Sequence, residues 1–338
     1  IQGDSAVNAR LDASLQVVAK RTASDDFKPE VTNANLRWQA ADALSVRVGR
    51  VNNPIFLYSD YRLVHYALPG VRPPAEVYGL SPTYVMDGID ARWRQVVRDW
   101  RVELYGGLHE SDVDAPRSNS TIVDTATLRS NATLVLSGEK GPWLLKGGVA
   151  SGLVTYATDV TDALFDALRA IDAGSPGAAA LADQLDLRGA RYELYTLALR
   201  YDDGDWTVAG EMARRNFARS YYRDSSGAYL TAGYRIDRWL PYLTLARRKT
   251  FGPTADSRAG PLSAEVSALL AATRYDQRSV ELGLARELGP GVTLKAQVEW
   301  LRPDANSWGA SLTNQSPDYG YASPPTFRLI SVNVDMVF

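Results

Sequence analysis

The side chains most often used in catalysis are few in this chain, and they do not form a recognisable constellation. His65 and His109 are the only histidines, and neither has a serine or carboxylate partner at a diagnostic spacing. We expect both to be solvated histidines in loops or at a rim. The segment Ser111-Asp112-Val113-Asp114 offers oxygen ligands for calcium, but an ordinary turn explains it better. With no cysteine and no glycine-rich phosphate loop, the sequence predicts no enzyme, no cofactor and no metal site.

Charged side chains at alternate positions of strand-like runs are the chemistry that the chain does offer. Basic residues outnumber acidic ones on the face that we expect to point inward, and rings of basic side chains favour anions in a pore. Pairing across strands, which would only stiffen the wall, is the alternative. The expected pore-lining residues are Arg10, Arg37, Arg47, Arg50, Arg92, Arg94, Arg101, Arg129, Glu103 and Asp90. The same alternation points Lys146, Arg215, Arg248 and Lys295 inward.

These side chains need a sheet to position them, and strand-like runs recur along the whole chain. Val292, Leu294 and Ala296 alternate with polar residues in one such run. A two-layer sandwich would also alternate, but here short turns and long loops alternate too, as in a membrane β-barrel. The expected strands cover residues 5–19, 32–41, 43–52, 88–98, 100–110, 121–138, 142–156, 190–202, 205–217, 227–236, 239–250, 273–288, 291–302 and 326–338.

Tryptophan follows a tight polar turn at the head of four of these runs, at Trp100, Trp143, Trp206 and Trp239. Water marks no fixed level along a sheet, whereas the membrane–water interface attracts the amphipathic indole. The sequence therefore predicts an all-β, transmembrane, antiparallel up-and-down β-barrel. We expect about 14 strands, with 16 as the alternative, and both termini at the turn end. A barrel of that size is too wide for side chains to fill.

Composition agrees with one large barrel spanning residues 1–338. The mean hydropathy of −0.23 suits a wall in which only every second residue meets lipid. No run approaches the roughly 18 apolar residues of a spanning helix. A net charge of −2 argues against a nucleic-acid partner. The chain starts Ile1-Gln2-Gly3, from which we expect that a leader has been removed.

The last run, in which Ile330, Val332, Val334, Met336 and Phe338 alternate with mostly polar residues, ends the chain on an aromatic residue. It resembles the C-terminal strand of Gram-negative outer-membrane barrels, which end on an aromatic carboxylate recognised by the insertion machinery. The resemblance implies the outer membrane of a Gram-negative bacterium as location, with outer-membrane lipid and lipopolysaccharide as partners.

Residues 53–87 form a long joint that prolines stiffen and aromatic residues can pack. The stretch Val48-Gly49-Arg50-Val51-Asn52-Asn53-Pro54 that opens it resembles the strand end before the constriction loop of trimeric porins. The resemblance implies that the joint folds into the lumen and that Arg50 joins a basic wall, although strict alternation points Arg50 outward. An external lid or an intersubunit latch is the alternative. The residues expected on the loop side are Asp60, Arg62, Arg72, Glu76 and Asp87.

Residues 157–189 have helical spacing at 162–171 and 178–187, and we expect an extracellular helical loop. Small residues at Ala9, Ala13, Ala34 and Ala40 indicate a flat outward patch through which a homotrimer could form. The predicted function is an outer-membrane porin for diffusion of small hydrophilic, anionic solutes through a water-filled lumen. The alternative is a non-conducting outer-membrane barrel that serves as an export or anchoring component.

Overall fold

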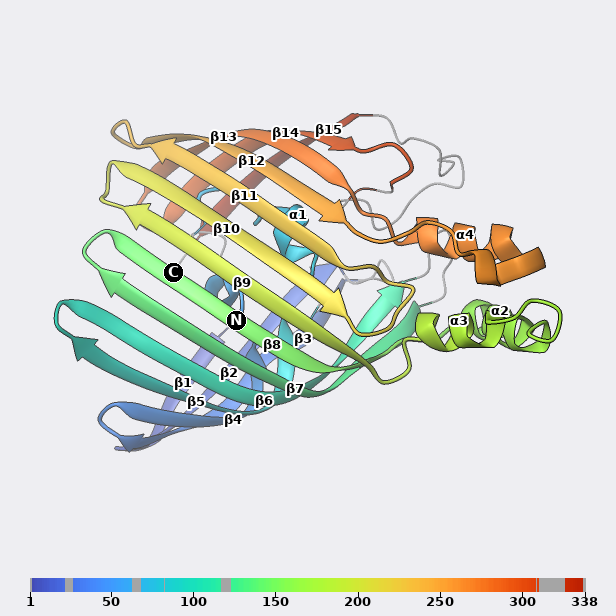
Figure 1. The fold of residues 1–338 in the computed structure, drawn as a ribbon. Helices are drawn as coiled ribbons and strands as arrows, with labels where there is room; N and C mark the ends of the chain where they lie inside the picture. The colour runs from blue at the N-terminus through green and yellow to red at the C-terminus, as the bar shows by residue number, and fades with distance from the viewer. Residues whose placement is uncertain are drawn as a thin grey trace.

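The computed structural model describes residues 2–21, 27–62, 68–81, 83–116, 123–307, 309 and 326–336. Its strands form one antiparallel sheet in sequence order, each paired with the next along the chain. Figure 1 shows this sheet wrapping around a central space, with helices α2 (Asp159–Ala170), α3 (Ala178–Leu185) and α4 (Ser263–Ala272) projecting from one end. The all-β up-and-down fold expected from the sequence is confirmed.

The sheet has fifteen strands in the described part of the chain. They are β1 (Gln2–Asn8), β2 (Leu11–Arg21), β3 (Phe27–Ala41), β4 (Leu44–Asn52), β5 (Val85–Val97), β6 (Trp100–Pro116), β7 (Val123–Lys140), β8 (Trp143–Thr155), β9 (Ala190–Asp202), β10 (Trp206–Phe217), β11 (Ser225–Tyr234), β12 (Trp239–Thr250), β13 (Gln277–Gly289), β14 (Val292–Pro303) and β15 (Phe327–Met336). The helical segments are η1 (Ser59–Tyr61), α1 (Ala75–Tyr78), α2 (Asp159–Ala170), α3 (Ala178–Leu185), η3 (Ser257–Leu262) and α4 (Ser263–Ala272).

The expected first strand, residues 5–19, is in fact a hairpin. Ala9 and Arg10 form a turn between β1 and β2, and Gln2 pairs with Gln16. Alternation alone hides such a turn, because a two-residue turn leaves the apolar pattern unbroken on both sides. Because β1 ends at this turn and Gln2 pairs with Gln16, part-way along β2, the described start of β1 lies away from the turn end, where both termini were expected.

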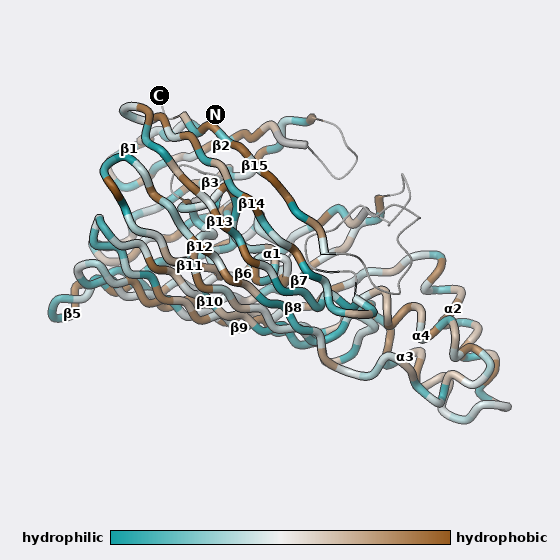
Figure 2. Tube along the Cα trace, turned by 90° about the horizontal axis from the view of Figure 1, so that it is seen from above, coloured by the Kyte–Doolittle hydropathy of each residue, from teal (hydrophilic) through white to brown (hydrophobic). Residues whose placement is uncertain are grey.

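The outward face of the sheet is apolar, which reverses the pattern of a water-soluble protein. On β12, Leu243 and Leu245 are exposed, whereas Tyr242, Thr244 and Ala246 at the alternate positions are buried. Figure 2 shows hydrophobic and hydrophilic positions alternating along the strands. Such an exposed apolar surface suits contact with lipid. Among the described residues, no helix combines the length and the apolar character needed to cross a membrane.

Tryptophans mark the turn end of this outward face. Trp143 and Trp206 are 44 % and 49 % exposed and begin β8 and β10. Their rings pack on cross-strand tyrosines, with centroids 4.7 Å apart for Trp143 and Tyr201 and 4.8 Å for Trp206 and Tyr234. Trp239 begins β12 in the same way. These pairs give the sheet an amphipathic edge of the kind found at a membrane interface.

The helices at the loop end form a small packed body of their own. Phe165 and Leu168 of α2, Leu181 of α3 and Val266 of α4 share one apolar cluster. Thr158 caps α2 by accepting a hydrogen bond from the Thr161 amide at 3.2 Å. Helices α2 and α3 lie close to the expected ranges, whereas η3 and α4 fall where we expected only a long loop.

Candidate functional site

The joint between β4 and β5 lies inside the barrel over its described residues 53–62, 68–81, 83 and 84, and we call these residues the lumen loop. Figure 1 shows α1, which belongs to it, within the space enclosed by the strands. Its residues Ile55, Leu57 and Tyr78 are almost fully buried in one cluster with wall residues such as Leu144 and Tyr229. The loop therefore fills one side of the lumen, the side formed by the middle and later strands.

Charged wall side chains hold the first part of the lumen loop by its backbone. Lys146 Nζ on β8 donates to the carbonyl oxygen of Phe56 at 2.7 Å. On β10, the Glu211 carboxylate accepts a hydrogen bond from the Leu57 amide at 2.8 Å. Hydrogen bonds to charged groups contribute about 1.5–3 kcal/mol each when neither partner can reach water, so this segment is firmly placed.

The later part of the lumen loop is held from β14 in the same way. Lys295 Nζ donates to the Leu68 carbonyl oxygen at 2.6 Å, and the Gln297 amide oxygen accepts from the Val71 amide at 2.7 Å. Arg72 forms an ion pair with Glu299. These wall groups turn toward the loop and satisfy backbone polar atoms that would otherwise be buried without a partner.

The end of α1 is fixed by two buried arginines. Arg215 on β10 donates to the carbonyl oxygen of Leu80 at 3.0 Å, and Arg248 on β12 donates to that of Gly79 at 3.2 Å. Cations at the C-terminus of a helical turn offset its unpaired carbonyl groups. The inward direction that alternation gives to Lys146, Arg215, Arg248 and Lys295 is therefore right, but all four bind the lumen loop, and Lys146 also lines the cavity beside it.

The other side of the lumen remains open as a cavity of about 910 Å³. Strands β4 to β9 form its wall, and the lumen loop closes it with Pro54, Leu57 and Asp60. Basic side chains outnumber acidic ones around it. The charged lining residues are Arg47, Arg92, Arg94, Arg101, Lys146 and Arg200 with Asp42, Asp60, Glu103 and Glu139.

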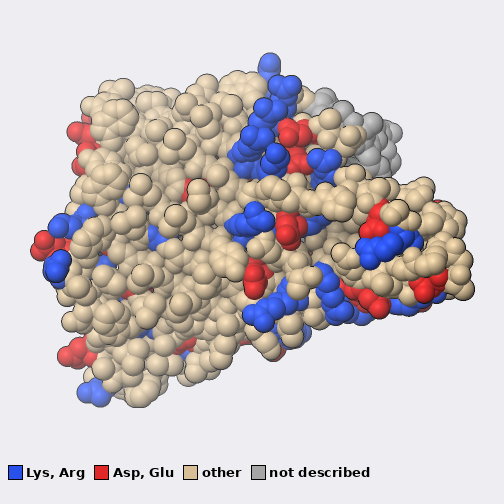
Figure 3. Space-filling view, viewed as in Figure 1, with Lys and Arg blue, Asp and Glu red and all other residues tan. Residues whose placement is uncertain are grey.

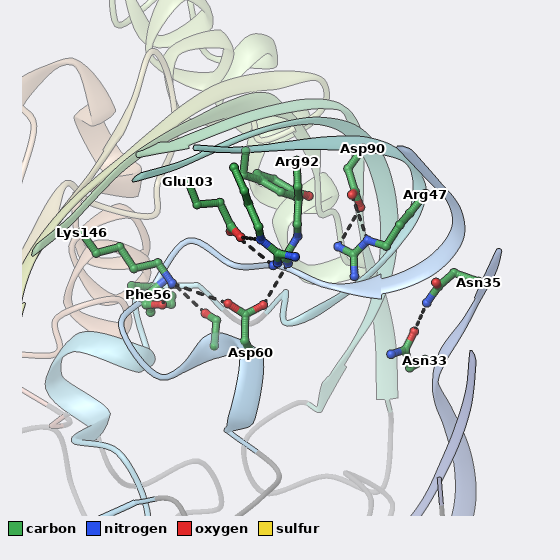
Figure 4. Close-up of polar contacts among 12 residues, drawn as sticks. Asn33, Asn35, Arg47, Phe56, Asp60, Asp90, Arg92, Glu103 and Lys146 are labelled. Atoms are coloured by element: carbon green, nitrogen blue, oxygen red, sulfur yellow. Dashed lines mark hydrogen bonds and ion pairs between the residues drawn. The ribbon is translucent and has the colours of Figure 1, made fainter. Parts of the chain in front are cut away.

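Asp60 is the loop residue that faces this basic wall (Figure 4). Its carboxylate lies 3.1 Å from Arg92 and 3.9 Å from Lys146, and its side chain keeps 41 % of its surface exposed. Enclosure within the barrel would by itself raise the pKa of Asp60, but the charges of Arg92 and Lys146 hold that pKa below its ordinary value of 3.8. Asp60 therefore stays ionised at neutral pH and narrows the cavity opposite the arginines.

Most of the arginines around the cavity have carboxylate partners. Arg92 and Arg94 share Glu103, at 3.3 Å and 2.6 Å. Arg47 binds both oxygens of the buried Asp90 at 2.9 Å (Figure 4). Pairing holds these side chains in place, and it also lowers the net positive charge that acts on a passing ion.

His109 is buried in β6, contrary to the expectation of a solvated histidine. Its side chain is 1 % exposed, and its Nε2 atom lies 3.7 Å from the Asp90 carboxylate and 3.4 Å from the Tyr105 hydroxyl. Alternation from Arg101 and Glu103 along β6 places His109 on the inward face, since the β6–β7 register shifts only beyond it, between His109 and Ser111. His65 lies outside the described residues, as does Phe338. Among the described residues, no group of three histidines or carboxylates could hold a metal ion.

Three residues expected in the pore lie elsewhere. Arg10 is exposed in the turn between β1 and β2. Arg50 lies on the outward face with Val48, because the β3–β4 register continues there without a bulge. Arg129 also faces outward, because a bulge at Ser130 and Asn131 shifts the alternation of β7. Arg37 lies beside a second, smaller cavity of about 510 Å³, paired with Asp12 at 2.7 Å.

The residues expected on the loop side also separate. Asp87 belongs to β5 and pairs on the outer wall with Arg50 at 2.7 Å. Arg62 stacks over the Tyr78 and Tyr84 rings, at 5.5 Å and 5.1 Å from their centroids. Arg72 anchors the loop as described above, and Glu76 is buried and accepts from Gln277 at 2.7 Å.

Some important residues were missing from the expected site. Arg200 and Glu139 line the cavity, and Glu211 and Gln297 hold the loop. Strand alternation would have placed all four on the inward face. Nothing in the sequence distinguishes a side chain that will meet the loop from one that will meet water.

Comparison with known structures agrees with this architecture. OmpF of Salmonella typhi, solved in complex with daunomycin, superposes with a TM-score of 0.56 at 11 % identity, covering 99 % of this chain and 88 % of that one. The chain has the fold of the outer-membrane porins. An anion-selective porin from Comamonas acidovorans gives 0.53 at 11 % identity, covering 90 % and 78 %. The outer-membrane channel DcaP of Acinetobacter baumannii gives 0.52 at 8 % identity, covering 89 % and 77 %.

Comparisons at the level of sequence give no match. No protein-family model matches the chain, and no curated protein matches it.

Proposed function

We propose that this porin-fold chain is an outer-membrane porin through which small hydrophilic, anionic solutes diffuse. The observation that carries the proposal is the cavity of about 910 Å³ between the lumen loop and a wall with a basic surplus. The apolar outward face with its edge of tryptophans supports a position in a membrane. The barrel would sit with its short turns toward the periplasm and its helices outside the cell.

The basic surplus supports anion preference even though part of its charge is paired. Arg101 and Arg94 line the cavity, and Arg94 keeps 58 % of its side chain exposed although it pairs with Glu103. A low-dielectric wall around a narrow aqueous space strengthens the field of such charges. Asp60 opposes them from the loop, so the selectivity we propose is moderate rather than strict.

Single-channel recording on the purified protein in a planar bilayer tests the proposal. A steady open conductance with a reversal potential on the anion side of a salt gradient is expected. A barrel that serves only export or anchoring would seal the bilayer and give no steady conductance. A cation-side reversal potential would keep the porin and reject its preference for anions.

We further propose a homotrimer that associates through the outward face of β2 and β3. Ala13 and Ala34 lie there as expected, but Leu15, Leu36 and Trp38 beside them are large and exposed. A mixed apolar surface of this kind can interdigitate with a second copy, as oligomer interfaces do.

A further inference from the structure

A row of arginines crosses the outward face where the apolar surface ends, at the end of the strands nearer the helices. Arg247 on β12 lies directly opposite Arg278 on β13, and Arg278 lies directly opposite Arg302 on β14. All three are exposed. We call these three residues the outer basic row. Figure 3 shows Lys and Arg side chains gathered over this end of β12 to β14, beside an outer face with few charges.

Placing like charges directly opposite each other on neighbouring strands destabilises a sheet. The acidic groups near the outer basic row offset little of this cost. Within the described part of the chain, its one ion pair joins Arg278 to Asp304 at 3.5 Å, between side chains that are 56 % and 29 % exposed. Lys249, on the same face of β12, adds a further cation.

Two outward arginines on the other side of the barrel have closer carboxylate partners. Arg50 on β4 pairs with Asp87 at 2.7 Å, and Arg129 on β7 pairs with Asp112 at 2.6 Å. The outer wall thus neutralises its cations on β4 to β7 and leaves them in surplus on β12 to β14. The repulsion among these arginines is not offset by nearby carboxylates, and a bound external anion would offset it.

The neighbours of the row indicate what kind of anion this is. One step toward the turns, Leu245 and Val280 continue the two strands and are 48 % and 40 % exposed. Leu243 and Leu282 follow on the next step. A ligand that covers both levels carries acyl chains below and negative charge above, at the depth of the lipid headgroups.

We propose that the outer basic row binds the phosphate groups of lipopolysaccharide in the outer leaflet. The guanidinium fork matches phosphate in a bidentate geometry, and neighbouring strands about 4.8 Å apart place three such forks within reach of one lipid A headgroup. This inference rests on the orientation given under Proposed function, since it requires the helical end to face outward.

The test measures binding of defined lipids to the full chain folded in detergent, by native mass spectrometry. The variant Arg247→Gln/Arg278→Gln/Arg302→Gln removes the row and keeps polar side chains. The matched control is Arg50→Gln/Arg129→Gln/Arg191→Gln, which removes three outward cations that have carboxylates within 4 Å. Heat-dependent gel mobility verifies that each variant is folded.

Diphosphoryl lipid A should bind the row variant at least about tenfold more weakly than the wild type, since each Lys or Arg near an anionic surface contributes about fivefold. The control variant should bind as the wild type does, and dephosphorylated lipid A should bind all three proteins equally weakly. Equal affinity of diphosphoryl lipid A for wild type and row variant would overturn the proposal. So would equal loss in the control, or displacement of the lipid by micromolar inorganic phosphate, which would indicate a site for free anions.

The same proteins separate this inference from the proposed function. Conductance and reversal potential should be unchanged in the row variant, because the row lies outside the lumen. Phosphate-dependent lipid binding by a barrel without conductance would leave the inference standing and reject the porin. Normal conductance without phosphate-dependent binding would do the reverse.

Discussion

The anion preference of the lumen should fall when Arg94 and Arg101 are replaced together by glutamine. Both line the cavity, and Arg94 is largely exposed, so neither replacement empties a buried site. A sphere with the cavity volume of about 910 Å³ has a radius of about 6 Å. With about 2 Å more from the cavity surface to the guanidinium carbon, an ion on the axis passes each guanidinium at a distance of about 8 Å. At that distance one charge contributes about 0.5 kcal/mol in water.

Two factors determine how far the anion-to-cation permeability ratio changes: salt screens each arginine charge, and each charge acts with opposite sign on anions and cations. At 0.1 M salt the Debye length is about 10 Å, which leaves roughly 0.2 kcal/mol per charge. Two charges acting with opposite sign on anions and cations then change the permeability ratio by about 1 kcal/mol, or roughly fivefold. At 1 M salt the Debye length is about 3 Å, and the same replacement should change the ratio by less than about 1.5-fold.

The assay measures the reversal potential in a tenfold potassium chloride gradient, once with a mean concentration of about 0.1 M and once with a mean of about 1 M. The control is Arg50→Gln/Arg129→Gln, which removes the same charge from the outer wall and should leave the reversal potential unchanged. An unchanged reversal potential in Arg94→Gln/Arg101→Gln at low salt would refute the reasoning. A shift of equal size at both salt concentrations would mean that the variant altered the pore's shape rather than its field.

Three further outcomes are expected. Asp60→Asn should increase anion preference, because it removes a negative charge from the cavity. The folded pKa of Asp60 lies below 3.8, so the wild-type carboxylate is charged above that pH. The difference in reversal potential between wild type and variant should therefore be constant from about pH 8 to pH 5 and vanish only as the pH falls through the folded pKa. Lys146→Met removes the bond to the Phe56 carbonyl and should cost about 1.5–3 kcal/mol in denaturant unfolding, whereas Lys140→Met, whose exposed pair with Asp99 contributes little, should cost less than about 1 kcal/mol. Native mass spectrometry in detergent should give a trimer, and a species of monomer mass alone would contradict the proposed association.

The charged residues illustrate how far strand alternation can be taken. It assigns Arg47, Arg92 and Arg94 to the inward face, where they line the cavity. It fails at Arg129, because a bulge shifts the face without leaving a mark in the composition. It correctly points Arg50 outward, and the inward role suggested by the likeness to trimeric porins does not apply to that residue.

Sequence alone determined the class of this fold, because two short-range signals are written into it. Period-two alternation assigns each strand an apolar face, and turns followed by tryptophan mark one edge of the sheet. Both depend on residues a few positions apart, so no tertiary information is needed to detect them. The turn at Ala9 and Arg10 could not be detected from the sequence because it interrupts neither signal. It divides the expected first strand into β1 and β2, which raises the number of strands from the expected 14 to 15.

Only the tertiary structure decided which inward charges belong to the pore. Lys146, Lys295 and Arg101 look alike in the sequence, each a cation on an inward position. Lys146 and Lys295 bind backbone carbonyls of the lumen loop at 2.7 Å and 2.6 Å, with Lys146 at the border of the cavity, whereas Arg101 lines the cavity from the wall opposite Glu139. Their contacts with the loop join positions 90 and 227 residues apart along the chain. Pairings over such separations follow from how the curved sheet and the lumen loop pack together, and no local pattern encodes them.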